Sequence, residues 1–435
     1  MQEIVYSAHV AEQSHSDVTT RLRNGVFLSK TLNTEKLPEQ APPANSAVPV
    51  LALGNGLTLS GVIRCFGRAR LPVYAVCPRR DVAAYSRWYR EPPLTVASAL
   101  KPIELETFLR ALPLDEAVLM PCSDDWLQAV VSLPTFLTRR FRSSLPPREV
   151  VHTMLNKWRF AELLVRTGTP HPRTILLHAP EEIHAVPEMN FGARIFKPLS
   201  SIEFAAKHGV KGYIVQNRAE ALRHAGDLEY PIMLQEYIPG PPTESYFIDG
   251  FIDRQGRVCA RFARQRIRMY PHGLGNSSLT ASISLSEVGD AVVILDHLLE
   301  AVAYRGIFSA EFKHDCRDGL FKILEVNARP WWYVEFAASC GVDVCRMAYA
   351  DALDLPVEAV HEYKVGRRCV FLPYDICAYR DLRRTDGLNL WLWGRSWVGA
   401  DGALFSWDDP GPAIAFTRDF GKGRLRSSGH RPKAA

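Results

Sequence analysis

Two glutamates in neighbouring segments of the chain have the residue type and spacing to hold a metal ion. Glu311 lies in the segment 308–313 and Glu325 in the segment 323–329. Both segments alternate apolar and polar residues, as half-buried strands do. The stretch between them ends in Gly319, and a three-residue loop at 317–319 predicts a hairpin in which Glu311 stands directly opposite Glu325. Because opposed like charges on a sheet repel, we expect a cation between them.

Asn327 extends this candidate metal site. Side chains alternate between the faces of a strand, so Asn327 is predicted on the same face as Glu325. Carboxylate and amide oxygens suit Mg²⁺, which commonly binds phosphate oxygens as well. Two solvated surface glutamates remain the alternative for the pair taken alone, but Asn327, Arg329 and the segments upstream favour the metal.

Lysines upstream of the hairpin are candidates for binding phosphate. Lys197 ends the apolar strand-like segment 193–196, where a phosphate partner or simple reach to solvent would explain a lysine. The basic connection that follows contains Lys211 and could fold over phosphates with its backbone N–H groups.

Two further segments could complete a nucleotide site. The apolar segment 233–240 runs into a Pro-Gly bend, which predicts unpaired peptide groups at Glu236 and Ile238, available to the edge of a flat heterocycle. Downstream, arginines at 264, 266 and 268 share one strand face ahead of a Gly- and Ser-rich loop, 271–278. This arrangement predicts an anion cradle, with a solvated edge strand as the alternative.

Elements of two kinds must position these residues. From 48 to 76, an apolar run, a glycine-rich turn, a helix and a second apolar run predict a parallel β-α-β unit. After Val151 the predicted strands and helices mix without strict alternation, and Ser284 to Glu287 forms a capping box that opens a long helix. We therefore predict an α/β lobe followed by an α+β lobe.

The glycines at 54, 56 and 61 invite comparison with a dinucleotide-binding loop. Their spacing is longer than that fingerprint, and no acidic residue closes the second strand to hold a ribose. Arg79 and Arg80 leave open the alternative that a phosphorylated ribose binds at this strand end. A structural Rossmann-like lobe is the favoured interpretation, and an NADPH-dependent oxidoreductase is the alternative from another class.

Composition sets the remaining limits. The 435 residues carry a net charge of +5 and nine cysteines without a CxxC pair, so neither a disulfide framework nor a cysteine metal site is expected. No apolar run approaches the roughly 18–20 residues of a membrane span, and no signal peptide is visible. We expect a cytoplasmic protein that binds no nucleic acid, because its basic tail lacks interleaved aromatic residues.

Taken in order, these segments resemble the ATP-grasp superfamily over about residues 151–360. The most specific match is the set Glu311, Glu325 and Asn327, which in that family binds Mg²⁺ between the phosphates of ATP. Supporting matches are Asn156-Lys157, Lys197-Pro198 and the hinge at 235–240. Within the superfamily the chain resembles carboxylate–amine ligases of the D-aspartate ligase-like type, and the segment 405–412 is similar to the end of those chains. The basic connection is poorer in glycine than the phosphate loop of many members.

The resemblance implies a fold class of α/β plus α+β: a Rossmann-like N-terminal lobe, then an ATP-grasp domain whose two α+β lobes clasp a nucleotide. The expected divisions are a leader and linker that need not be ordered (1–47), a Rossmann-like domain (48–150), the ATP-grasp domain (151–360), a C-terminal extension (361–420) and a basic tail (421–435).

The resemblance also implies an activity and residue roles. ATP would activate a carboxylate as an acyl phosphate, which an amine converts to an amide; the cofactors are ATP and Mg²⁺, with Mn²⁺ as an alternative ion. An ATP-grasp kinase or carboxylase and a non-catalytic ATP-binding protein remain open, as does the oligomeric state, a homodimer included. The implied roles are phosphate contacts for Lys157, Lys197 and Lys211, adenine contacts for Glu236 and Ile238, a ribose contact for Glu244, and stabilisation of the transferring group by Arg329 and Arg266.

Overall fold

A computed structural model describes residues 47–94, 100–187, 193–199, 204, 207–208, 212–385 and 387–426, with side chains up to residue 418. The chain divides into Met1–Pro42, which lies outside these residues, and Pro43–Ala435, which contains all of them. No helix among the described residues is long and apolar enough to cross a lipid bilayer.

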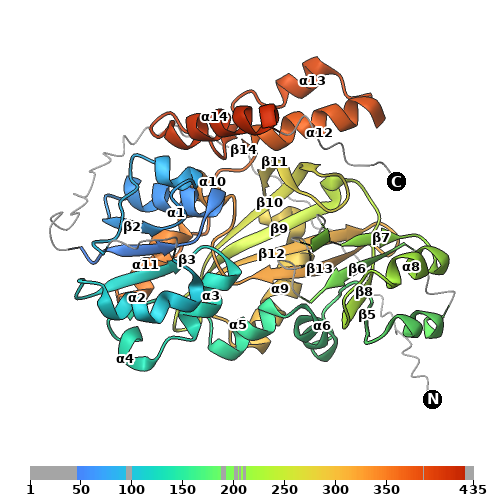
Figure 1. Cartoon of the computed structure of the whole chain (residues 1–435), viewed down its shortest axis with the longest axis horizontal. Coiled ribbons are helices and arrows are strands. Elements are labelled where there is room, and N and C mark those ends of the chain that lie inside the picture. Colours follow the sequence, from blue (N-terminus) through green and yellow to red (C-terminus); the bar gives the residue numbers. More distant parts are fainter. Residues whose placement is uncertain are drawn as a thin grey trace, which may run out of the picture. The chain divides into compact units, whose positions relative to one another are not determined.

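The first lobe is a four-stranded parallel sheet with strand order β2-β1-β3-β4. Helix α1 covers one face of this sheet, and α2, α3 and α4 cover the other (Figure 1). Strand β1 is buried on both faces, which explains its uninterrupted apolar sequence. The predicted parallel β-α-β unit and the α/β lobe that contains it are therefore confirmed. Its elements are β1 (Val50–Leu53), α1 (Gly56–Arg68), β2 (Val73–Val76), α2 (Leu105–Ala111), β3 (Ala117–Pro121), α3 (Asp124–Val131), α4 (Thr135–Thr138) and β4 (Phe141–Arg142), with 3₁₀ helices η1 (Val82–Tyr85) and η2 (Pro102–Glu104).

The second lobe contains a four-stranded antiparallel sheet with strand order β5-β8-β6-β7. Its apolar face packs against α8 and the 3₁₀ helix η3. The strands that carry Lys197 and the hinge, β6 and β8, lie side by side in this sheet. The elements from here are α5 (Arg148–Leu155), α6 (Lys157–Arg166), β5 (Thr174–Leu177), η3 (Pro180–Ala185), β6 (Arg194–Pro198), β7 (Tyr213–Val215), α8 (Arg218–Ala225) and β8 (Ile232–Glu236).

The largest sheet has seven strands in the order β13-β12-β9-β10-β11-β14-β15. Helices α5, α6 and α9 pack against one of its faces. The predicted capping box at Ser284 is present, and it starts a 3₁₀ turn that leads into α9. The strand predicted to carry Arg264, Arg266 and Arg268 is the long strand β10, which begins at Val258. The elements are η5 (Pro242–Glu244), β9 (Ser245–Ile252), β10 (Val258–Tyr270), β11 (Asn276–Ile283), η6 (Leu285–Val288), α9 (Gly289–Ala301), β12 (Gly306–Asp315), β13 (Leu320–Asn327), β14 (Arg368–Val370) and β15 (Asp401–Gly402).

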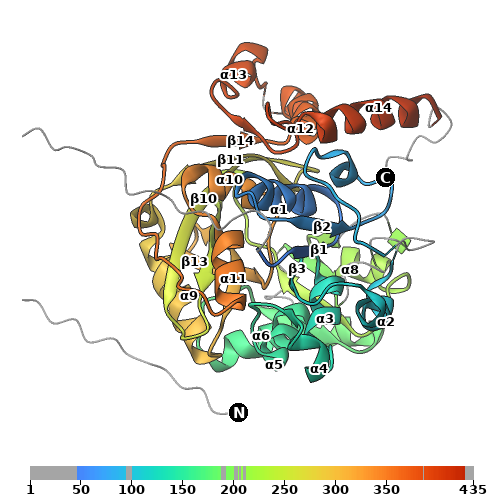
Figure 2. The same cartoon turned by 90° about the vertical axis from the view of Figure 1, so that its left-hand side faces the viewer.

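The chain returns to the first lobe after β13. Helices α10 (Val334–Cys340) and α11 (Val344–Ala352) share a hydrophobic core with α1 and the parallel sheet, and both views place them beside α1 (Figures 1 and 2). The chain then forms α12 (Leu372–Thr385), α13 (Leu390–Arg395) and α14 (Gly411–Arg426). Helix α12 packs against β10 and β11, and α14 packs against η1 of the first lobe.

Candidate functional site

The β12–β13 hairpin has the register that the sequence predicted around its glutamates. Glu311 pairs with Glu325, and Ser309 pairs with Asn327. The loop differs from the prediction: Asp315 pairs with Leu320, so four residues rather than three connect the strands. A bulge after Glu311 adds one residue on β13 and restores the predicted opposition. Gly319 has φ +73°, the left-handed conformation expected for it.

The side chains of this hairpin form a set of oxygen ligands on one face of the sheet. The Nδ2 of Asn327 donates to Glu325 Oε1 at 3.1 Å. Arg266 donates from Nη2 to Glu311 Oε1 at 2.9 Å. Glu325 is exposed and Glu311 is partly buried. Two carboxylates and an amide are hard oxygen donors, a set that fits Mg²⁺ or Mn²⁺.

Lys197 faces the two glutamates from the neighbouring sheet. Burial lowers its pKa from the ordinary lysine value, while the charges of Glu325 and Glu311 act in the opposite direction. Its Nζ makes no hydrogen bond within the described part of the chain. Lys197 is half-buried; a partly desolvated cation without a hydrogen-bonded partner is costly, and an anion brought into this space would relieve the cost.

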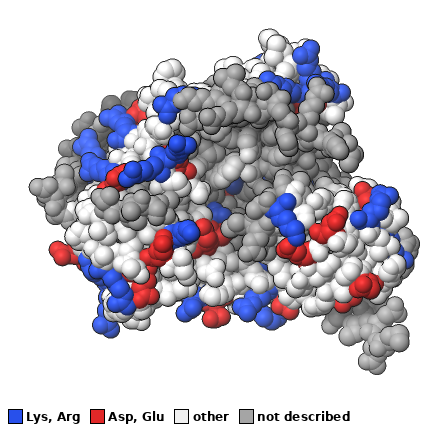
Figure 3. Space-filling model, in the orientation of Figure 1, with Lys and Arg blue, Asp and Glu red and all other residues white. Residues whose placement is uncertain are grey.

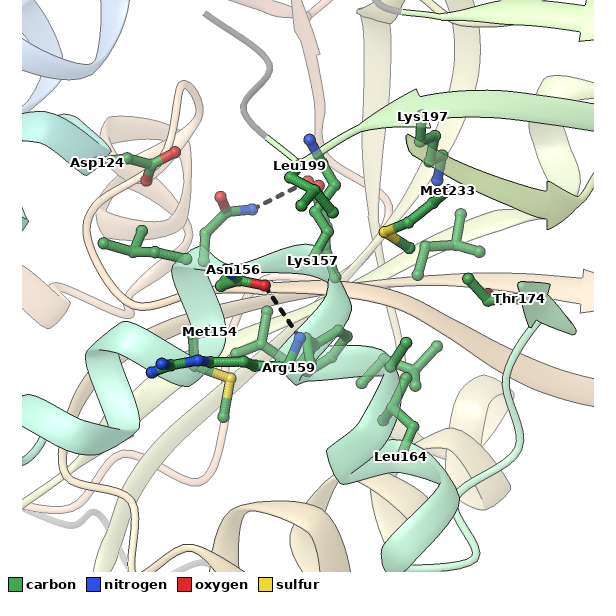
Figure 4. A pocket seen from close by; sticks show the side chains of 18 of the residues that line it. Asp124, Met154, Asn156, Lys157, Arg159, Leu164, Thr174, Lys197, Leu199 and Met233 are labelled. Carbon is green, nitrogen blue, oxygen red and sulfur yellow. Dashed lines mark hydrogen bonds between the residues drawn. The ribbon is translucent and has the colours of Figure 1, made fainter. Parts of the chain in front are cut away.

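Lys157 lies at the start of α6, close to the end of β6. Asn156 caps this helix by accepting from the amides of Trp158 and Arg159, the second of which is drawn in Figure 4. The Lys157 Nζ donates to the carbonyl of Pro198 at 3.2 Å. The cap therefore fixes the helix start that carries Lys157 beside the strand that carries Lys197.

Two cavities meet at these residues. The first has a volume of about 550 Å³, and the second about 230 Å³. In Figure 4, Asp124 and Lys197 lie on opposite sides of the first cavity. The second cavity reaches the hinge and the glycine-rich loop 272–276. Residues that line both are Lys157, Lys197, Gln235, Leu324 and Glu325.

The hinge is only partly as predicted. The amide of Glu236 is not free, because it donates to the carbonyl of Arg173 at 2.8 Å. The Glu236 carboxylate is held by Arg317 at 2.6 Å. Arg173 directly precedes β5, which pairs with β8, so the edge of β8 at Glu236 is not free for a ligand. Ile238 is buried in the wall of the second cavity, and its amide has no hydrogen bond within the described residues.

Glu244 and Lys211 are the other two predicted nucleotide contacts. Glu244 pairs with His314, whose Nδ1 lies 2.9 Å from its Oε2, and it does not line either cavity. Lys211 lies outside the described residues.

The three arginines of β10 have protein partners, which corrects the prediction of a shared anion cradle. Arg264 is buried and pairs with Asp249 at 2.7 Å. Arg268 is also buried and pairs with Asp375 at 2.8 Å. Only Arg266 of the three lines the second cavity, where it passes over the Phe247 ring to reach Glu311.

Arg329 links the hairpin to the first lobe. Its Nε donates to Asp124 Oδ1 at 2.6 Å, and its Nη2 lies 3.4 Å from Asn327 Oδ1. Asp124 is the first residue of α3 and lines the larger cavity. The guanidinium is therefore held next to a proposed metal ligand by a carboxylate distant in sequence.

Lys313 is a site residue that the sequence analysis missed. Its Nζ donates to the carbonyls of Gly240 and Pro241, at 3.1 and 2.6 Å. Burial, then the charge of Arg266, lowers its pKa to about 8. Its position two residues after Glu311 could have identified it, because alternation along a strand places both side chains on one face.

The first lobe does not offer the phosphate site that a dinucleotide would need. Both carboxylate oxygens of Asp81 accept from the amide of Gly56, the first residue of α1, at 3.0 and 2.9 Å. In dinucleotide-binding lobes this helix start receives the pyrophosphate. The side chain of Asp81 occupies it here, which disfavours the oxidoreductase alternative.

Comparisons with known proteins agree with this architecture. No family model matches the chain. The D-aspartate ligase of Enterococcus faecium (strain Aus0004) is 22% identical over 335 residues, 70% of this chain and 76% of that protein.

Solved structures share the fold at low sequence identity. The biotin carboxylase domain of Hydrogenobacter thermophilus 2-oxoglutarate carboxylase, solved with MgADP, ADP and bicarbonate, has a TM-score of 0.58 at 14% identity, covering 74% of this chain and 73% of that one. The L-amino acid ligase of Bacillus licheniformis has a TM-score of 0.51 at 16% identity, covering 72% and 75%. These likenesses establish the fold.

Proposed function

We propose that this chain, whose fold is that of the ATP-grasp enzymes, is an ATP-dependent ligase that joins a carboxylate to an amine. The observation that carries the proposal is the opposition of Glu311 and Glu325 beside Lys197, at the junction of two cavities. Support comes from the similarity to a D-aspartate ligase and an L-amino acid ligase.

The same proposal assigns the nucleotide and metal. Glu311, Glu325 and Asn327 would hold Mg²⁺, or Mn²⁺ in its place, and the ion would neutralise charge on the ATP phosphates. The MgADP complex of the carboxylase domain supports this assignment. Lys157 and Lys197, with Lys211 from the basic connection, would bind phosphate oxygens. The adenine edge would meet the hinge at Glu236 and Ile238, where the Ile238 amide is the available donor. Glu244 would contact the ribose.

The reaction needs positioning more than covalent catalysis. A carboxylate oxygen of the substrate attacks the γ-phosphorus of ATP, giving an acyl phosphate and ADP. The amine then attacks the acyl carbon, and phosphate leaves as the amide forms and the nitrogen loses its proton. Arg266 and Arg329 would stabilise the charge on the transferring phosphoryl group and the substrate carboxylate.

A different acceptor is the second candidate. The carboxylase domain has a TM-score at least as high as that of the L-amino acid ligase, so carboxylation or phosphorylation by the same site is the alternative. Incubating the protein with ATP, amino acids and small acids distinguishes them, because mass spectrometry detects an amide only for the ligase. A non-catalytic ATP-binding protein would show binding without ADP release.

We also propose the setting in which this activity operates. The substrates are a small carboxylate and a small amine, the compartment is the cytoplasm, and no nucleic acid takes part. The domain divisions predicted from the sequence are kept, with the ATP-grasp domain at 151–360. The oligomeric state, including a homodimer, is open to measurement by ultracentrifugation.

The direct test is the variant Glu325→Gln. Removing one ligand charge should lower ATP consumption on the order of 10²–10³-fold, by analogy with other preorganised charges. The fold should persist, because Glu325 is exposed. The matched control is Glu300→Gln, which changes an exposed glutamate on α9. Normal ADP release by Glu325→Gln would refute the metal assignment.

A further inference from the structure

Helices α12 and α13 present a surface on which large apolar and cationic side chains stand together. Leu390, Trp391 and Val398 are 61%, 64% and 73% exposed. Leu392 is also exposed. Four exposed large apolar side chains within nine residues are a candidate place for another molecule to bind.

The orientation of α13 is fixed, so these side chains cannot turn inward. Trp393 and Trp397 both donate from Nε1 to the buried carboxylate of Asp375, at 2.9 and 2.8 Å. Tyr379 of α12 stacks on Trp393 with ring centroids 4.4 Å apart. Trp393 and Trp397 therefore face inward, and Leu390 and Trp391 are left exposed to solvent.

Cationic side chains surround the apolar ones. Arg380, Arg383 and Arg384 are exposed on α12 at the i, i+3 and i+4 spacing that places them on one side of the helix. The guanidinium of Arg395 lies 5.2 Å from the centre of the Trp391 ring. Figure 3 shows basic side chains gathered over α12 and α13, at the upper right. Among the described residues of 372–398, Asp381 is the one exposed acid.

An apolar cavity continues this surface inward. It has a volume of about 560 Å³ and is lined by aliphatic and aromatic side chains of α12 and α14. Arg380 and Trp397 also line it, so it lies beneath the surface that carries the arginines.

We propose that this α12–α13 surface binds an anionic lipid bilayer, with Leu390 and Trp391 entering the interface and the arginines facing lipid phosphates. Apolar and Trp side chains beside Arg are the combination that segments lying in a membrane interface use. α13 has six residues, fewer than the roughly 20–30 residues that each partner of a stable protein–protein interface contributes. The attachment would be peripheral.

The test is flotation of the full chain with lipid vesicles, without substrates. The protein should float with vesicles that contain phosphatidylglycerol, much less with pure phosphatidylcholine, and less at high salt. Each arginine near an anionic surface strengthens binding by about fivefold. Arg383→Glu combined with Arg384→Glu should therefore reduce binding at least tenfold, as should Leu390→Ser combined with Trp391→Ser.

Matched controls are Val293→Ser, at an exposed valine of α9, and Arg148→Glu, at an exposed arginine of α5; both should float like the parent. The double variants should keep their thermal unfolding and any ATP turnover, because none of these residues lies in the proposed catalytic site. Failure of the parent to float, or equal flotation of the double variants, would overturn the proposal. A dimer that Leu390→Ser with Trp391→Ser abolishes, without vesicle binding, would assign the surface to a second copy instead.

Discussion

At the scale of single residues, the lysines of the cleft have environments that depart most from ordinary surface lysines. Lys197 is held near two carboxylates without a hydrogen-bonded partner within the described residues, and Lys313 is buried against two carbonyls. Both have lowered pKa values because burial penalises their charged form. They are therefore placed to gain from a bound anion.

Replacing Lys197 by Met should weaken nucleotide binding. A hydrogen bond from a charged group contributes about 1.5–3 kcal/mol, so we expect roughly a 10- to 100-fold higher dissociation constant for a non-hydrolysable ATP analogue. Titration calorimetry measures it. Lys101→Met, at an exposed lysine that lines neither cavity, is the control and should bind normally. Unchanged affinity in Lys197→Met would remove that lysine from the phosphate site.

Lys313 should make stability depend on pH. Its folded-state pKa of about 8 lies below the ordinary value of 10.5. Below pH 8 both states bind the proton, and the burial cost is fully present. Between pH 8 and 10.5 the unfolded state binds the proton that the folded state has lost, so this group's contribution to stability rises with pH.

The measurable quantity is the free energy of unfolding of the parent minus that of Lys313→Met. It should increase by roughly 1–2 kcal/mol from pH 7.5 to 9.5. The same difference for Lys101→Met, at an exposed lysine, should stay flat. A difference that falls over this range would contradict the proposed cause.

At the scale of elements, Asp375 joins the C-terminal helices to the strand that carries Arg266. Its carboxylate accepts five hydrogen bonds: two from Arg268, and one each from Ser278, Trp393 and Trp397. These four residues all act as donors, so both oxygens at this position must be acceptors.

Asp375→Asn should therefore be strongly destabilising. The new NH₂ group would face a donor whichever way the amide turned, and Arg268 would lose its counter-charge. Breaking a buried pair from one side costs about 3–5 kcal/mol, which denaturant unfolding followed by Trp fluorescence would report. Asp381→Asn makes the same substitution at an exposed site on α12 and should change stability by less than about 0.5 kcal/mol. Similar stability of the two variants would show that the network contributes little.

The same scale shows what could be predicted from the sequence. The opposition of Glu311 and Glu325 follows from local alternation and one glycine, and it was confirmed. The four-residue loop and the bulge were not predicted. The opposition of the glutamates was still correct, because these two errors of one residue cancel there. The partners of Arg264 and Arg268 were missed since they depend on sheet pairing and on a helix 107 residues away.

At the scale of the whole described unit, Arg64 holds the end of the chain on the first lobe. It is fully buried and pairs with Asp409 at 2.8 Å and Glu335 at 3.0 Å. Its Nη2 also donates to the carbonyls of Leu404 and Asp409. One side chain of α1 therefore contacts both α10 and the segment before α14.

Arg64→Met should reduce the free energy of unfolding by about 3–5 kcal/mol, because buried carboxylate and carbonyl oxygens lose their donor. Arg68→Met is the matched control one turn later on α1. Arg68 pairs with Asp408 and Glu335 but is partly exposed, so about 1 kcal/mol or less is expected. Equal decreases in the free energy of unfolding of the two variants, measured in urea, would show that burial of Arg64 does not matter.

The carboxylate of Asp81 at the start of α1 has a consequence for how this architecture can change. A lobe of this topology usually presents its first helix to a ligand, but here the protein supplies that ligand from its own chain. Replacing Asp81 by Ala would remove this carboxylate and leave the Gly56 amide open to another acceptor. Asp81 therefore occupies this helix start within the described residues, and the proposed phosphate site lies elsewhere, beside Lys157 and Lys197.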